Sequence, residues 1–221
     1  MYEPRFELVE WGVIEVAGER VITTIFMEES LTALYTRALQ VVLAWPDGRK
    51  TVEQFGGGWR THPVNARFEP FGGHEGMTMI VVDCSSVVNV KRQFYSLDSS
   101  GSVVLIRLES LSGRHVRNDY TRSNARVGPA MPSLTADECR RRLASGHPSD
   151  VLSCLVWLGG EHQTEPVPKG YEHSLEDGAV GTRVREILGD VHVLEQLRAL
   201  TESSCEWVAE AARACLAAAA R

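Results

Sequence analysis

Hydrophobic residues in the first half of the chain occur in short runs bounded by turn residues, a pattern typical of β-strands. Alternation is clearest in residues 102–109, whose apolar positions are Val104, Ile106 and Leu108 and whose polar positions are Arg107 and Glu109. This strand is predicted to bury one face only, as strands of antiparallel sheets commonly do. The other predicted strands are Phe6–Val16, Arg20–Phe26, Leu39–Trp45, Thr51–Phe55, Met77–Cys84 and Val87–Phe94.

Turn residues separate these runs where hairpins would close. Residues 17–19 (Ala-Gly-Glu) connect the first two strands, and residues 46–48 (Pro-Asp-Gly) connect the next two. Proline presets the φ angle of a turn's first position, and glycine accepts a positive φ. Residues 98–101 (Asp-Ser-Ser-Gly) form the turn before the alternating strand. Residues 30–40 are ambiguous, because their leucines also recur at helical spacing.

From residue 133 onward the apolar residues recur every three or four positions, which predicts amphipathic helices. Thr135 and Glu138 have the spacing of a capping box, in which each side chain bonds the other residue's backbone N–H. The pair His147-Pro148 predicts the start of a second helix, since proline is favoured at the first helical position. Its inward-facing residues are predicted to be Val151, Leu155 and Leu158.

The last part of the chain predicts further helices. Asp190 is expected to begin one of them, and Ser203 with Glu206 predicts a capping box before an alanine-rich helix over about residues 204–220. Residues 174–188 have a less regular pattern, because two glycines interrupt it.

The two helices at residues 190–200 and 206–216 resemble a HEAT-type helical hairpin. In the second of them Trp207 stands beside Val208 and is followed by alanines and then by Leu216, as at this spacing in that family. Residues 134–159 resemble a weaker unit of the same kind. The chain departs from the family pattern at Ala209, where arginine is usual. The resemblance implies a small helical domain whose apolar faces must be covered by a neighbouring part of the structure.

Between the two halves, residues 119–132 lose apolar periodicity and gain Pro, Gly, Ser and Asn, which is typical of a linker. The predicted organisation is therefore an antiparallel β-domain at 1–120, a linker at 121–132 and a HEAT-like helical domain at 133–221. The fold class is α+β, with the first domain expected to be a β-sandwich or an open barrel.

Composition and charge narrow the class of protein. The 221 residues are 43% hydrophobic and 24% charged, which is ordinary for a folded chain. Five cysteines, an odd number without close pairing in sequence, favour reduced thiols. The first residues show no basic region followed by an apolar stretch, and no apolar run approaches the length of a membrane span. We expect a cytoplasmic protein, of bacterial type, with no membrane contact.

Common catalytic signatures are absent, including the nucleophile elbow, the zinc-protease pattern and the phosphate-binding loops. The glycine-rich segments at 54–60 and 71–76 are therefore expected to be loops between strands, and no cofactor is predicted. His62, His74 and Glu75 have side chains that suit a metal, but their spacing does not gather them, so no metal site is predicted. Cys84 ends an apolar run and is expected to be a small core residue. An enzyme with a site in these loops, convergent on Arg60, His62, His74 and Cys84, is the alternative hypothesis.

Positive charge is concentrated in the centre of the chain. Residues 91–142 contain ten basic and five acidic residues, whereas residues 143–221 contain six and twelve. Arg114, Arg117, Arg122 and Arg126 are the candidate partner-binding residues, with docking against the acidic helical region favoured over nucleic acid. The function predicted first is a non-enzymatic binding or scaffold protein that contacts another macromolecule, expected to be a protein of unknown identity. Weak nucleic-acid binding through the arginines is the third hypothesis.

Overall fold

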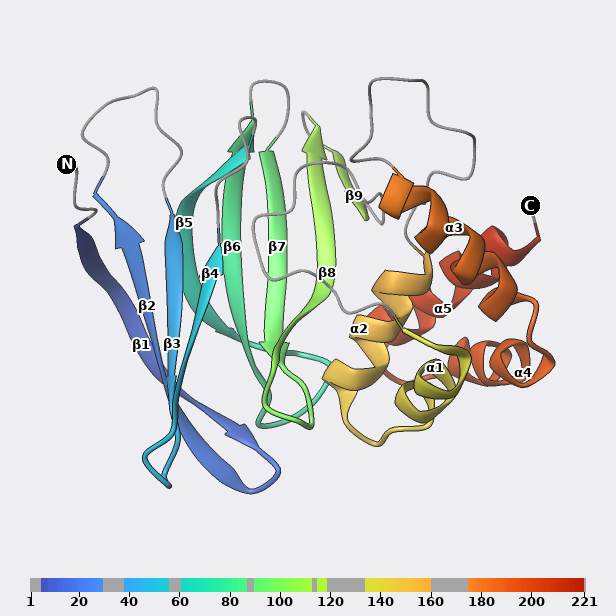
Figure 1. Cartoon of the computed structure of the whole chain (residues 1–221), viewed down its shortest axis with the longest axis horizontal. Coiled ribbons are helices and arrows are strands. Elements are labelled where there is room, and N and C mark those ends of the chain that lie inside the picture. Colours follow the sequence, from blue (N-terminus) through green and yellow to red (C-terminus); the bar gives the residue numbers. More distant parts are fainter. Residues whose placement is uncertain are drawn as a thin grey trace. The chain divides into compact units, whose positions relative to one another are not determined.

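The computed structural model confirms the α+β class: two antiparallel sheets are followed by five helices in the part of the chain that it describes. The described residues are 5–29, 38–55, 61–86, 90–112, 115–118, 134–159 and 175–220. Contacts divide these residues into two compact units, one up to Asn118 and the other from Leu134 (Figure 1). Each unit is described by itself below.

The first sheet has the order β1-β2-β3-β4, each strand antiparallel to the next. Its strands are β1 (Phe6–Val16), β2 (Glu19–Glu28), β3 (Leu39–Ala44) and β4 (Lys50–Phe55). The predicted hairpins at residues 17–19 and 46–48 are confirmed, and Gly18 and Gly48 both have positive φ angles. Val21, Ile25 and Val41 are fully buried, so one face of this sheet contributes to the core.

The second sheet has the order β5-β6-β7-β8-β9. Its strands are β5 (Thr61–Pro70), β6 (Thr78–Ser86), β7 (Val90–Leu97), β8 (Val103–Ser112) and β9 (His115–Asn118). The predicted turns at residues 71–76 and 98–101 are confirmed. Strands β5 and β9 were not among the predicted ones. Two prolines interrupt the strand pattern of β5 in the sequence. They are tolerated because β5 is at the edge of the sheet order.

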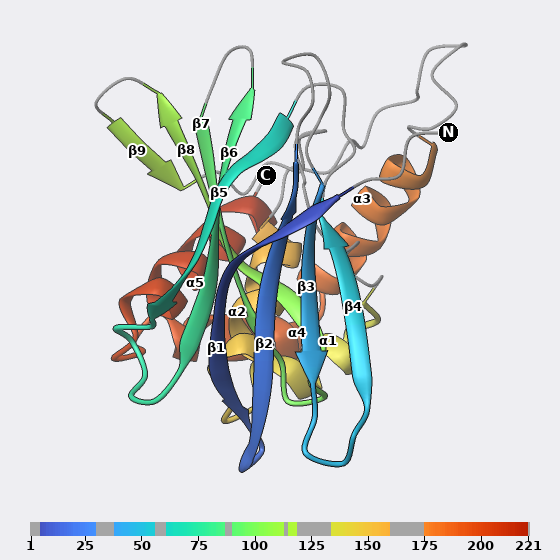
Figure 2. The same cartoon turned by 90° about the vertical axis from the view of Figure 1, so that its left-hand side faces the viewer.

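The two sheets meet along β1 and β5, which lie side by side in Figure 2. The Glu10 carboxylate accepts a hydrogen bond from the backbone N–H of Phe68 at 2.9 Å. A Cβ atom added to Gly12 would lie 3.2 Å from the Phe68 ring, so glycine permits this close approach. Whether the two sheets form the layers of a sandwich or an open barrel stays a prediction.

One prediction for the second sheet is wrong. Strand β8 does not bury a single face: Val103, Leu105 and Ile106 are all buried, and the side chains of Arg107 and Glu109 are each only 12% exposed. The register shifts between Phe94 and Tyr95 where β7 pairs with β8, which changes the alternation read from the sequence.

The second unit consists of α1 (Ala136–Leu143), α2 (Pro148–Gly159), α3 (Leu175–Leu188), α4 (Val191–Leu200) and α5 (Glu206–Ala219). Two predicted helix starts are confirmed: Thr135 accepts a hydrogen bond from the Glu138 N–H, and Asp190 accepts from the N–H groups of His192 and Val193. Helix α3 continues through both glycines that made it doubtful.

The predicted capping box at the start of α5 is wrong. The N-cap residue is Cys205, whose side chain makes no capping hydrogen bond. The Ser203 hydroxyl instead accepts from the Cys205 N–H at 3.2 Å, within the turn before the helix. The Ser203–Glu206 spacing matched the capping pattern two residues too early.

Helix α1 contacts α2, and α4 contacts α5, while α2 and α5 are in turn packed together. Residues on every side of α2, from Ser149 to Leu158, are buried, so its burial is much wider than the predicted stripe of Val151, Leu155 and Leu158. No helix among the described residues is both long and apolar enough to cross a membrane. The predicted linker, 121–132, lies outside the described residues, so the domain boundaries stay a prediction.

Candidate protein-interaction face

The first sheet carries apolar side chains on both of its faces. Side chains paired across an antiparallel sheet point to the same side, so the register assigns each residue to a face. One face, defined by Val21, Ile25, Leu39 and Val41, is buried. We call the opposite one the exposed apolar face. Its apolar residues are Phe6, Leu8, Trp11, Val13, Ile22, Phe26, Val42, Ala44 and Val52.

Solvent exposure on this face is large for side chains of this kind. Trp11 is 64% exposed, Leu8 and Val52 are each 58% exposed, and Ile22 is 50% exposed. Single exposed hydrophobic residues are common in proteins, but a contiguous group of them on one face of a sheet marks an interaction site. The exposed apolar face is therefore the strongest candidate functional surface among the described residues.

One face of the second sheet carries ion-paired side chains. Asp83 on β6 accepts hydrogen bonds from the guanidinium groups of Arg67 and Arg92, both at 2.7 Å, and Arg67 also bonds Glu69 at 2.6 Å. Arg107 bonds Glu109 at 2.8 Å along β8. The register places these groups on one side of the sheet, which we call the charged face.

The charges of this face balance one another. Burial alone would lower the pKa of the Arg67 guanidinium, but the hydrogen bonds that it donates to Asp83 and Glu69 outweigh burial and raise that pKa. Arg92 belongs to the basic centre of the sequence, and its described partner is an aspartate of its own sheet. The charged residues of this face are therefore explained by their ion pairs with one another, which is a structural role.

The four candidate partner-binding arginines are not tested by these contacts. Arg117 is in β9, and its side chain is outside the described part of the structure. Arg114, Arg122 and Arg126 lie outside the described residues altogether. Their docking against the helical region stays a prediction.

Two residues of the enzyme hypothesis, His62 and His74, lie at opposite ends of one hairpin. His62 pairs with Ser85 at one end of the β5–β6 hairpin, whereas His74 is in the turn at the other end. Pro70 is eight positions along β5 from His62, which corresponds to about 26 Å of extended strand. Cys84 is fully buried, as expected of a core thiol, and Arg60 lies outside the described residues. No group of three or more metal-ligating side chains occurs within the described ranges.

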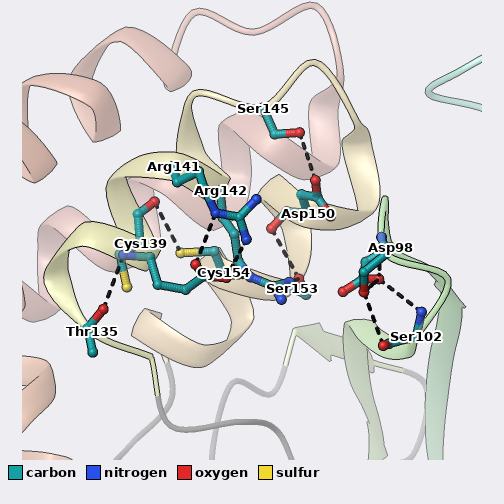
Figure 3. Close-up of polar contacts among 12 residues, drawn as sticks. Asp98, Ser102, Thr135, Cys139, Arg141, Arg142, Ser145, Asp150, Ser153 and Cys154 are labelled. Atoms are coloured by element: carbon teal, nitrogen blue, oxygen red, sulfur yellow. Dashed lines mark hydrogen bonds and ion pairs between the residues drawn. The ribbon is translucent and has the colours of Figure 1, made fainter. Parts of the chain in front are cut away.

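Polar groups in the helical unit also have structural roles (Figure 3). The Ser145 hydroxyl donates to the Asp150 carboxylate at 2.8 Å and accepts from the His147 backbone N–H at 3.1 Å. This arrangement closes the turn before α2 and does not place an imidazole on a nucleophile. Arg142 bonds Glu138 at 2.9 Å and the Ser153 hydroxyl at 3.2 Å, linking α1 to α2. Hydrogen bonds from the neighbouring arginines lower the pKa of Glu138.

Three cysteines lie in the core of the helical unit. The Cys154 thiol faces the Cys139 carbonyl oxygen at 3.9 Å, a contact drawn in Figure 3, and the Cys215 thiol donates to the Leu155 carbonyl at 3.3 Å. Interaction with Cys139 and burial raise the pKa of Cys154, and burial raises the pKa of Cys215. A thiol with a raised pKa carries little thiolate at neutral pH, so these groups are poor nucleophiles.

The chain matches no known protein family, and neither the curated proteins nor the solved structures include a match. Function must therefore be argued from the surface itself.

Sequence reasoning missed the exposed apolar face, although a signal for it was present. Neighbouring positions such as Val13 and Ile14, or Val21 and Ile22, are both apolar, which places hydrophobic residues on both faces of one hairpin. Such a run ordinarily predicts burial on both sides. The sequence therefore indicates a second apolar face, but it does not indicate that this face is exposed.

Proposed function

We propose that this chain is a non-enzymatic binding protein that contacts another protein through the exposed apolar face of β1–β4. The observation that carries the proposal is the exposure of Trp11, Ile22 and Val52 together on one side of a sheet. Apolar area left in water costs about 25 cal/mol per Å², and a partner recovers that free energy when it covers the face. Exposed tryptophan is also among the residues that contribute most to protein interfaces.

We keep the HEAT-like helices in the proposal, as a second part of the scaffold. The pairing of α1 with α2 and of α4 with α5 supports it, since each pair corresponds to one proposed hairpin. A cytoplasmic location is part of the same proposal. All five cysteines are free thiols, which is what a reducing compartment favours.

Photo-crosslinking in the cells that produce the protein tests the proposed function. A benzoylphenylalanine at position 22 is expected to form a crosslink, because that side chain lies in the exposed apolar face. The same group at position 191 is the control, since Val191 is 57% exposed but belongs to the helical unit. The crosslinked chain is identified by mass spectrometry, and an Ile22→Asp variant should lose at least about tenfold in affinity for it.

The function proposed here is rejected if position 22 forms no crosslink under conditions in which the chain is folded. Equal crosslinking at positions 22 and 191 also contradicts it, because that result indicates contact without preference for the face.

A further inference from the structure

The exposed apolar face has an ordered arrangement of rows across its four strands. The central row is Trp11, Thr24, Val42 and Val52. The row on the side of the β1–β2 turn is Val13, Ile22, Ala44 and Lys50, and the row on the opposite side is Leu8, Phe26, Gln40 and Gln54. Beyond these rows, Glu15 pairs with Arg20 at the turn end, and Phe6 pairs with Glu28 at the other end.

We propose that a second copy of this chain covers the exposed apolar face, so that two copies pack face to face; this inference rests on the proposed function. Most homodimers are built on a two-fold axis that brings the same patch of each copy together. An axis along the central row reverses the strand direction and places each strand over its own equivalent.

The rows complement themselves under this symmetry. Trp11 lies beside its own equivalent near the axis, and Ile22 lies over Phe26 of the second copy. Val13 meets Leu8 in the same way, so β1 and β2 bring apolar residues together, while on β3 and β4 Ala44 lies over Gln40 and Lys50 over Gln54. Two aligned sheets pack at about 10 Å with interleaved side chains, which this set of residues permits.

The charges of the two ends are also complementary. The turn end holds Glu15, Arg20 and Lys50, a net positive charge, and the opposite end holds Glu28, a negative charge. The proposed axis places Arg20 over Glu28 of the second copy, and symmetry makes this pair twice. One oxygen of Glu28 already accepts from the Ala38 N–H at 3.1 Å, which holds the carboxylate in place.

The size of the face fits a reversible dimer. Four strands spaced about 4.8 Å apart span about 19 Å, and six residues at about 3.3 Å each extend about 20 Å, giving a flat footprint of about 400 Å². Side-chain relief increases the buried area beyond this footprint. Stable interfaces bury about 800 Å² on each partner, so this dimer belongs to the weaker, concentration-dependent class.

An anionic membrane is a poorer occupant of the same face. Residues 1–90 contain seven basic and twelve acidic groups, so this part of the chain is repelled by a negatively charged surface. The exposed apolar face itself carries acidic as well as basic residues at its edge.

Sedimentation velocity of the purified full chain over a concentration series tests the proposal. The wild type is expected to change from monomer to dimer at micromolar to submillimolar concentration. Arg20→Glu and Glu28→Arg should each weaken the dimer about a hundredfold, because each places like charges together twice. The double variant should recover most of the wild-type affinity, since it restores the opposite charges in exchanged positions.

Lys50→Glu is the matched control, because it makes the same charge change but faces Gln54 of the second copy under the proposed axis. Its dimer affinity should stay within about threefold of the wild type. Glu28→Gln, which keeps an acceptor for the Ala38 N–H, serves if Glu28→Arg fails to fold, and it should give an intermediate loss.

Three results overturn the second-copy proposal. They are a wild type that stays monomeric throughout, a double variant no better than the single ones, and a Lys50→Glu variant as weak as Arg20→Glu. The last would indicate an axis parallel to the strands, which brings Lys50 over Val13 of the second copy, next to Glu15. If position 22 forms crosslinks only to a different protein, the second-copy proposal is rejected and the proposed function stands.

Discussion

The two sheets differ in how residue type and exposure are combined. The exposed apolar face of β1–β4 presents hydrophobic side chains to water, whereas the charged face of β5–β8 keeps ionised side chains largely out of it. Asp83 is only 16% exposed and bonds two arginines. Folding alone explains the ion pairs of the charged face, since buried charges need partners. It does not explain the hydrophobic side chains that the first sheet presents to water.

Under the proposed function, the two sheets should respond differently to substitution. A charge removed from the second sheet should damage stability, because its partners stay behind in a partly buried place. A hydrophobic side chain removed from the exposed apolar face should affect association far more than stability.

The largest expected effect comes from Asp83→Leu. This change removes the carboxylate shared by Arg67 and Arg92, and it should lower the free energy of unfolding by about 3 kcal/mol. Urea denaturation measures it, below the concentration at which the chain associates. Val52→Ser on the exposed apolar face is the control and should stay within about 0.5 kcal/mol of the wild type. Similar losses for both variants would remove the distinction between the two faces.

A smaller effect is expected where a turn of the first sheet touches a turn of the second. A Cβ atom added to Gly101 would lie 2.1 Å from the Trp45 ring, and Gly101 has a φ of 80°. Gly101→Ala should therefore destabilise the chain by about 2 kcal/mol, partly relieved by movement of the ring. Gly48 has a φ of 87° with open space around it, so Gly48→Ala should cost about 1 kcal/mol. Thermal unfolding compares them, and equal losses would show that the contact between the turns is unimportant.

Much of the fold was predictable because local signals agree with it. Alternating runs and turn residues identified most strands, and the side chains at Thr135 and Asp190 marked two helix starts. Strand β5 was missed because Pro63 and Pro70 are breakers inside a sheet, and only its place at the edge makes them acceptable. Edge position depends on strand order, which local pattern does not contain.

The candidate site was less predictable than the fold. The sequence directed attention to histidines, glycine-rich loops and arginines, which carry chemistry in their side chains. The exposed apolar face carries none, and its residues resemble core residues in every local respect. What distinguishes Ile22 from its neighbour Val21 is exposure of 50% against none, a property of the assembled sheet.

Hydroxyl-radical footprinting of Trp11 over a concentration series shows whether a second copy covers the exposed apolar face. Trp11 should be oxidised readily in dilute protein and at least about threefold more slowly in concentrated protein, as the second copy covers it. Met79 is the internal control, because it lies on the charged face of the second sheet and not on the exposed apolar face. It is only 3% exposed, so its oxidation should be slow at every concentration. A Trp11 oxidation rate that does not change with concentration, while Met79 stays protected, would contradict the assignment of this face to a second copy.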